Sequence, residues 1–180
     1  MSRPLKVFFG FLILIAVSAI IWSTFFTGED TEYGQIPELA LPLHAGEPPV
    51  LLSSFQERPG VKGRVVLLDF YSSWYGPSRK NMQQLEGLYE KYNEKGLVVI
   101  GISLDHADTR GQVPKFLREL GITYPTCFGD DIFDLRSKYK FKTQSQLYVI
   151  DKHGKIHDHI NSVDPHIDLE EMIVKLLNAK

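Results

Sequence analysis

Residues that could do chemistry gather between Val65 and Lys80, in the segment VVLLDFYSSWYGPSRK. Tyr75 and Ser78 stand there at the start of a predicted helix, where unpaired N–H groups and the helix dipole favour a negatively charged nucleophile. A phenol, however, has a pKa of about 10, and a serine hydroxyl needs a positioned base before it can attack. The sequence also lacks the nucleophile-elbow motif of serine hydrolases. We therefore assign neither residue a catalytic role.

A second candidate is Cys127, the only cysteine in the 180 residues. Thiol–disulfide exchange needs one thiolate that attacks and a second thiol that releases the mixed disulfide. A single cysteine supplies neither an internal dithiol cycle nor an internal disulfide, so we expect the hydrophobic core alone to hold the fold. Lone cysteines are more often small buried hydrophobes than reactive groups, and we interpret Cys127 in that way. The alternative is a reactive thiol that works with an external thiol.

Three histidines lie in the segment KHGKIHDHI, namely His153, His157 and His159. The last two would share one face of a strand and, with Asp158 or His166, could approach a metal ion. Without a committed third ligand, an exposed polar edge explains them better, so we predict no metal and no cofactor. The formal charge is −2 and no Lys/Arg cluster stands out, which gives no reason to expect nucleic acid as a partner.

The elements that position these residues follow from hydrophobic periodicity. Nearly continuous apolar runs predict strands that are buried on both faces, at residues 64–70 and 97–104. Further extended pieces are predicted at 123–127, at 146–151 and 155–160 as a hairpin, and at 39–43 and 50–55 as an N-terminal hairpin. Amphipathic spacing predicts helices over 77–95, 113–120, 131–139 and from 168 onward. This order predicts an α/β domain with a central mixed sheet and helices on both faces.

An uncharged stretch precedes this domain, at residues 7–26. As a helix it would be about 30 Å long, which matches the hydrocarbon core of a membrane. Basic residues precede it and acidic residues follow it, so the positive-inside rule predicts a single-pass signal-anchor with a cytoplasmic N-terminus, 1–6, and a periplasmic or otherwise extracytoplasmic domain. Residues 27–36 are predicted as a linker and 37–180 as the domain. The alternative is a signal peptide cleaved after Val17-Ser18-Ala19, but the apolar run is long for one.

The segment 65–80 resembles the active-site stretch of the thioredoxin superfamily, and in detail that of the membrane-anchored TlpA/ResA-type thiol–disulfide oxidoreductases. That family shows an apolar strand, an aromatic-rich turn and then Trp-Cys-x-Pro-Cys-Arg-Lys at the start of a helix. The resemblance extends over 37–180 and includes the segments GLVVIGISLD, LGITYP and VIDKHGKI. It implies a thioredoxin-like (redoxin) fold with an N-terminal β-hairpin extension, placed after one transmembrane helix and facing the periplasm or outer side of a bacterial membrane.

Three positions depart from the family pattern where its chemistry requires particular residues. Tyr75 and Ser78 stand where the family has its two cysteines, and Ser145 stands where it has the cis-proline that faces them. A cis peptide before a non-proline residue costs about 2.5–4 kcal/mol, so we expect the peptide before Ser145 to be trans. Asp69 matches the buried carboxylate that assists proton transfer in thioredoxins. Without a thiol to serve, we interpret it as a hydrogen-bonded carboxylate near a strand end, with a raised pKa if it is buried.

These departures favour a redox-inactive protein-binding module over an enzyme. The former active-site surface would contact an envelope protein or an extended polypeptide, because a large amphipathic ring such as Tyr75 at an exposed helix start suits an interface. Packing inherited from the family is the simpler explanation for Trp74 and Tyr71. The predicted binding surface comprises Trp74, Tyr75, Gly76, Pro77 and Ser145. The alternatives are an oxidoreductase or antioxidant activity through Cys127, and a degenerate copy that retains only the ancestry.

Overall fold

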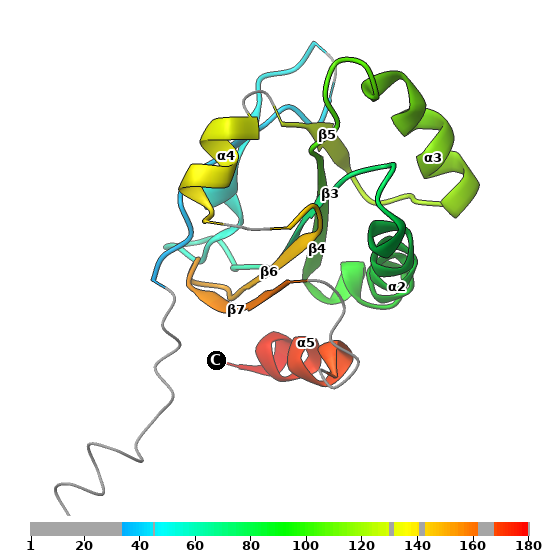
Figure 1. The fold of residues 1–180 in the computed structure, drawn as a ribbon. Coiled ribbons are helices and arrows are strands. Elements are labelled where there is room, and N and C mark those ends of the chain that lie inside the picture. Colours follow the sequence, from blue (N-terminus) through cyan, green and yellow to red (C-terminus); the bar gives the residue numbers. More distant parts are fainter. Residues whose placement is uncertain (1–33, 45, 130–131, 141–142, 162–167, 180) are drawn as a thin grey trace, which may run out of the picture. The chain divides into compact units, whose positions relative to one another are not determined.

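The computed structural model describes residues 34–44, 46–129, 132–140, 143–161 and 168–179. Its centre is a five-stranded mixed sheet with the strand order β5-β4-β3-β6-β7 (Figure 1). Helices pack on both faces of the sheet, and each face has its own hydrophobic cluster. A separate two-stranded hairpin, β1-β2, lies near the N-terminal end of the domain. The predicted mixed sheet with helices on both faces is therefore confirmed.

The central strands are β3 (Val65–Tyr71) and β4 (Leu97–Ser103), which run parallel with Tyr71 opposite Ser103. Every residue of β3 is buried. The continuous apolar run forms a strand here because both of its side-chain faces are covered. Since the strands are parallel, their C-terminal ends meet at one edge of the sheet, where β3 leads into the loop 72–75 and β4 leads into Asp105.

Three further strands complete the sheet. β6 (Gln146–Ile150) pairs antiparallel with β3, and β7 (Ile156–Ile160) pairs antiparallel with β6. The turn between them contains Gly154 with a φ of +81°, a left-handed conformation that favours glycine. β5 (Thr126–Phe128) lies parallel to β4 on its far side. It starts later than the predicted 123–127, because Pro125 has no N–H to donate to a strand ladder.

One face of the sheet is covered by α2 (Gly76–Tyr92), α3 (Val113–Leu120) and α5 (Leu169–Asn178) (Figure 1). Their apolar stripes form one cluster with alternate side chains of β3, among them Leu67 and Tyr71. Each helix buries the face that its apolar spacing of three and four residues creates. The motif helix α2 is thereby fixed against the central strand that leads into it.

The helix ends follow local rules. After α2 comes a short 3₁₀ helix, η2 (Asn93–Lys95), and Gly96 then ends the segment with a φ of +112°. Asp168 caps α5, because its carboxylate accepts a hydrogen bond from the N–H of Glu171 at 2.9 Å. Pro77 lies in the first turn of α2, where no intrahelical N–H bond is lost. The helices thus begin and end close to the predicted positions.

The opposite face is covered by α4 (Ile132–Lys138) and by the N-terminal segment with β1 (Ala40–Leu41) and β2 (Val50–Leu51). The predicted hairpin is present, but its strands are much shorter than 39–43 and 50–55. The rest of the second piece forms a 3₁₀ helix, η1 (Leu52–Phe55). Its residues Leu-Ser-Ser-Phe do not alternate between apolar and polar, so a longer strand would gain little from pairing, whereas the turn buries Leu52.

The folded domain includes residues that the sequence placed in the linker. Ile36 is 7% exposed and donates its N–H to the carbonyl of Gly154 at 2.9 Å, while Gln35 forms a β-bridge with Lys155. The predicted membrane segment 7–26 lies outside the described residues. Within the part of the chain that the structure describes, no helix has the length and hydrophobicity needed to cross a bilayer.

Candidate functional site

Tyr75 occupies the N-cap position of α2, at the end of the loop that leaves β3. Its N–H donates to the carbonyl of Ser72 at 3.1 Å, and its own carbonyl accepts from the N–H of Ser78 at 3.0 Å. The phenol makes no capping hydrogen bond to the helix and is partly exposed. A ring in this place offers a surface for contact, and it leaves the first N–H groups of the helix without a side-chain cap.

Ser78 faces the interior of the protein. It is 0% exposed, and its Oγ accepts a hydrogen bond from the N–H of Ser72 at 3.3 Å. Among the described residues, this is the hydrogen bond that its hydroxyl makes, and no histidine or carboxylate is positioned to take its proton. The hydroxyl therefore holds the loop in place rather than meeting a substrate.

Ser145 is also completely buried, where it contacts a residue of α2. The Nδ2 of Asn81 donates to Ser145 Oγ at 2.9 Å, and Thr143 Oγ1 donates to the Ser145 carbonyl at 2.8 Å. No cis peptide occurs in the described residues, so the peptide before Ser145 is trans, as predicted. Sequence reasoning missed Asn81, although it lies three residues after Ser78 and so on the same side of the helix.

Asp105 holds the loop that carries the motif, and sequence reasoning missed it as well. Its carboxylate is 0% exposed and accepts hydrogen bonds from Ser73 N at 2.9 Å, Ser73 Oγ at 2.6 Å and Ser103 Oγ at 2.9 Å. A second contact joins Ser72 Oγ to Gln144 Oε1 at 3.3 Å. The available signal was a carboxylate directly after a buried parallel strand, at the sheet edge where the motif loop also begins.

The exposed part of the site consists of Trp74, Tyr75, Gly76 and Pro77, which we call the motif surface. Trp74 is 56% exposed, and its ring meets that of Tyr75 edge-on at 6.1 Å. Inherited packing therefore does not account for Trp74, because the loop turns its ring outward. A groove of about 450 Å³ lies next to the motif surface and is lined by Ser73, Arg79, Gly111, Gln112, Lys115, Phe116 and Glu119.

Two predicted members of this aromatic and binding surface lie in the interior. Ser145 is buried against Asn81, so it supports the motif surface from below and does not belong to it. Tyr71 is 0% exposed, as inherited packing predicts, and its ring stacks on that of Phe116 at 6.1 Å. The strand alternation places Tyr71 on the face that α2 and α3 cover.

Asp69 is entirely buried in β3, two residues before the end of the strand. Neither carboxyl oxygen has a hydrogen-bond partner among the described residues, so the predicted hydrogen bonding is wrong, although the position near the end of the strand is as predicted. Burial raises its pKa to about 8, which confirms the predicted direction, because desolvation disfavours the charged form. The pKa of the Tyr124 phenol is also raised, mainly by burial and to a smaller extent by the negative charge that Asp69 carries when it is ionised. Asp69 is therefore mostly protonated at neutral pH.

Cys127 lies in β5 and is 8% exposed. It belongs to the hydrophobic cluster on the α4 side of the sheet, whereas α2 and its neighbours pack on the other side. Its burial among apolar residues matches the interpretation as a small hydrophobe. The sheet thus separates the thiol from the core beneath the motif helix.

The histidines of the β6–β7 hairpin have structural surroundings. His159 stacks on Tyr148 with ring centroids 4.1 Å apart, and its Nε2 is hydrogen-bonded to Gln146 Oε1. Burial lowers the pKa of His159. His157 sits beside a register shift in the β6–β7 pairing, and His166 lies outside the described residues. Within the described ranges, no three His, Cys, Asp or Glu side chains converge as metal ligands.

Comparison with known proteins finds thiol–disulfide oxidoreductases among the relatives of this chain. A model of the AhpC/TSA family matches residues 34–159. The thiol-disulfide oxidoreductase ResA of Bacillus thuringiensis subsp. konkukian is 30% identical over 115 residues, which cover 64% of this chain and 65%, just under two thirds, of that relative. ResA of Bacillus anthracis is 27% identical over 177 residues, covering 95% of this chain and 96% of the relative.

A solved structure gives the same answer for the fold. The crystal structure of a candidate thiol:disulfide interchange protein DsbE from Chlorobium tepidum is similar with a TM-score of 0.68 and 29% sequence identity. The similarity covers 82% of this chain and 99% of that one. This likeness confirms the predicted thioredoxin-like α/β fold.

Proposed function

The chain belongs to the AhpC/TSA family, and from this premise we propose that it is a membrane-anchored, extracytoplasmic binding module that no longer catalyses thiol–disulfide exchange. Its relatives named ResA are thiol-disulfide oxidoreductases, and the scaffold that carries their type of site is retained here. What has changed is the set of groups that the scaffold presents at the start of α2.

The observation that carries this proposal is the location of sulfur. Exchange with a client disulfide requires a thiolate in contact with that client and a second thiol to complete the cycle. The start of α2 presents the phenol of Tyr75 and encloses the hydroxyl of Ser78. The thiol of Cys127 is 8% exposed and packs on the other side of the sheet. With one cysteine, the chain has no pair of thiols that could form and break a disulfide.

Binding is supported by the exposure and rigidity of the motif surface. Trp74 and Tyr75 offer two aromatic rings at the protein surface, and such rings are frequent anchors of protein interfaces. The loop beneath them is held by Asp105 and by Ser78. A surface that is already ordered loses little conformational entropy when a partner binds. We propose an extended segment of another envelope protein as the partner.

Membrane attachment is part of the proposal and rests on the uncharged stretch 7–26. The positive-inside rule then puts the domain on the extracytoplasmic side. A protein held there would meet membrane and envelope proteins at high local concentration, so even a modest contact through the motif surface would be occupied.

A disulfide reduction assay tests the loss of chemistry. The full-length chain, purified in detergent, is given insulin and a reductant, and is compared with Cys127→Ser and with Tyr75→Cys/Ser78→Cys. We expect insulin reduction by the native chain and by Cys127→Ser to remain at the uncatalysed rate. The double variant should gain partial activity, limited by the trans peptide before Ser145 and by the buried position 78. Catalytic turnover by the Cys127→Ser protein would overturn the proposal.

Photo-crosslinking in intact membranes tests the binding role. A photoreactive residue is placed at Tyr75 or, as a control, at Glu90, which is exposed near the other end of α2. We expect a discrete crosslinked partner at position 75 that disappears when Trp74→Ala is added. Equal crosslinking at both positions, or a partner that ignores Trp74→Ala, would contradict a role for the motif surface.

A further inference from the structure

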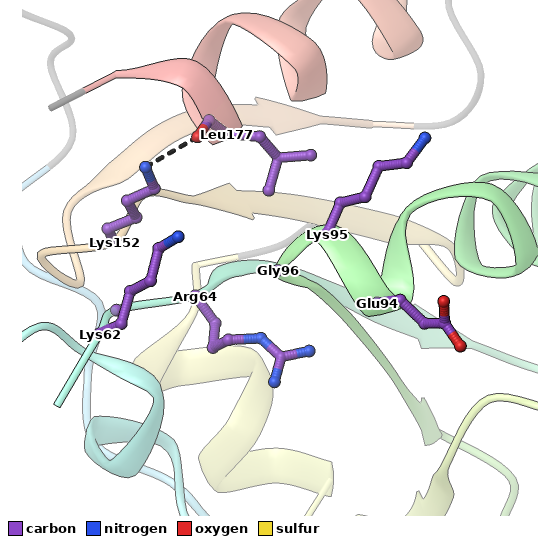
Figure 2. Close-up of a pocket in the computed structure, with 8 residues that line it drawn as sticks. Lys62, Arg64, Glu94, Lys95, Gly96, Lys152 and Leu177 are labelled. Atoms are coloured by element: carbon purple, nitrogen blue, oxygen red, sulfur yellow. Dashed lines mark hydrogen bonds between the residues drawn. The ribbon is translucent and has the colours of Figure 1, made fainter.

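A basic pocket of about 300 Å³ lies at the end of the sheet opposite the motif surface. It is formed where β3 and β4 begin, together with the β6–β7 turn and the end of α5 (Figure 2). Its charged lining residues are Lys62, Arg64, Glu94, Lys95 and Lys152. The seven residues of β3 separate the pocket from the motif loop, a distance of about 23 Å.

Two of these cations are held in place by backbone carbonyls. Lys152 Nζ donates to the carbonyls of Leu177 and Ala179, at 2.9 and 2.6 Å. Arg64 Nη2 donates to two carbonyls at 3.0 and 3.2 Å, one in η2 and one at the start of β4. The Nε of Arg64 is buried and has no partner among the described residues. Carbonyls carry only partial charges, so both cations are fixed without being neutralised.

The pocket therefore has an excess of positive charge. Of the described residues, none forms an ion pair with Lys62, Arg64, Lys95 or Lys152. The ammonium of Lys95 lies over the ring of Tyr92, 4.9 Å from its centroid, so its charge is kept as well. The carboxylate of Glu94 points away from the ammonium groups of Lys62 and Lys152 (Figure 2). Cations gathered in a concave site with low-dielectric walls strengthen each other's field and attract an anion. A phosphate group, with several acceptor oxygens, suits the ammonium donors of Lys62 and Lys152, while the guanidinium of Arg64 points to the other side and adds its charge (Figure 2).

The chain enters the folded domain beside this pocket. Gly34 accepts from the N–H of Ile156 at 3.2 Å, and Ile36 donates to Gly154 at 2.9 Å. Lys152 belongs to the same turn of the β6–β7 hairpin. Residues 27–33 connect this point to the proposed anchor and span at most about 25 Å when extended. A membrane that held residues 7–26 would therefore be within reach of the basic pocket.

We propose that the basic pocket binds the phosphate of an anionic phospholipid headgroup and so docks the domain on its own membrane. Docking in this way directs the motif surface away from the bilayer, toward a partner. The inference rests on the membrane anchoring in the proposed function and is independent of whether the motif surface has lost its chemistry. It adds to the anchor a second, electrostatic contact, which fixes the orientation of the domain.

Hydrogen exchange of the full-length chain in lipid nanodiscs tests this site. Amide exchange at residues 62–64 and 94–97 is compared in phosphatidylcholine discs, in the same discs with added inorganic phosphate at matched ionic strength, and in discs with increasing phosphatidylglycerol. The variant is Lys62→Gln/Lys95→Gln. The charge-matched control is Lys80→Gln/Lys115→Gln, on α2 and α3 at a distance from the pocket.

We expect phosphatidylglycerol to slow exchange at the pocket in the native chain and in the control. The pocket variant should need about 25-fold more anionic lipid for the same protection, about fivefold for each lysine removed. Equal protection of variant and native chain would overturn the pocket as the site. Protection by inorganic phosphate with no further effect of phosphatidylglycerol would show a site for free phosphate and overturn the lipid assignment. Absence of protection under every condition would overturn the pocket as a phosphate site of either kind. A chain that fails to enter the discs would refute the anchor as well as the docking, whereas insulin reduction by the native chain would refute only its redox inactivity.

Discussion

Asn81 Nδ2 and Ser145 Oγ are joined by a hydrogen bond of 2.9 Å in the interior of the domain. Asn81 belongs to α2, and Ser145 directly precedes β6, so the contact ties the motif helix to the loop that faces it. The second polar atom of the amide, Asn81 Oδ1, is buried without a partner among the described residues. The helix is thus attached to this loop by a buried polar contact.

A double-mutant cycle should detect this attachment. We expect Asn81→Ala and Ser145→Ala each to lower the free energy of unfolding, with a coupling of about 1 kcal/mol between them, because each change leaves the other group buried and unpaired. The measurement is urea unfolding of the two single variants, the double variant and the native chain. Gln83→Ala, on the exposed side of α2, serves as the control and should change stability by less than about 0.5 kcal/mol. Additive effects at positions 81 and 145 would contradict the contact.

Asp105 should be essential for the position of the motif loop. Asp105→Ala removes the acceptor of both Ser73 hydrogen bonds, so we expect a loss of about 2–4 kcal/mol in the free energy of unfolding, since bonds to a charged group are strong and the donors stay partly buried. The fluorescence of Trp74 in the folded protein should shift as well, because the loop that carries it is released. The exposed neighbour Asp108, changed to Ala, provides the comparison. Equal stability of the two variants would contradict this role.

Asp69 should make the domain less stable as the pH rises. Its pKa is raised by burial from 3.8 to about 8, so between these values the folded state binds a proton that the unfolded state has released. The stabilisation from the protonated form is complete below pH of about 4 and is lost progressively toward pH 8, with at most about 4 kcal/mol lost between pH 5 and 8.

Urea unfolding of Asp69→Asn at several pH values checks this dependence. The variant cannot titrate, so its free energy of unfolding should fall less than that of the native chain from pH 5 to pH 8. The lowered pKa of His159 acts in the opposite sense, and comparing the two proteins at each pH cancels its contribution. Asp108→Asn, an exposed substitution, should keep the native slope. Parallel curves for the native chain and Asp69→Asn would refute the buried titration.

Cys127 should react slowly in the folded protein. Because its side chain is 8% exposed and packed on the α4 side of the sheet, a thiol reagent reaches it only after local opening. We expect labelling by a disulfide reagent to be at least about 100-fold slower in the native chain than in denaturant. Glutathione in the same solutions controls for the reagent. Labelling of the native chain as fast as that of glutathione would show an accessible thiol and would revive the lone-cysteine activity.

The sequence by itself determined most of the elements and the absence of an internal dithiol. Continuous apolar runs and helical spacing predicted β3, β4, α2 and α3 close to their observed limits, because local periodicity reports which faces a segment must bury. The presence of Cys127 as the only cysteine excludes an internal dithiol in any fold. The trans peptide before Ser145 also followed from the chain alone, since its cost is a local property of the backbone.

Only the tertiary structure decided which polar groups meet. Asn81 and Ser145 are 64 residues apart in sequence, and Ser73 and Asp105 are 32 apart, so no local pattern connects them. Ser145 was predicted on the surface but is buried, because neither periodicity nor motif spacing determines how a loop turns its side chains. Asp69 was predicted to have a hydrogen-bond partner, yet its carboxyl has none within the part of the chain that the structure describes. The basic pocket likewise joins residues near 63, 95 and 152, which become neighbours only when the sheet brings together strand ends that are distant along the chain.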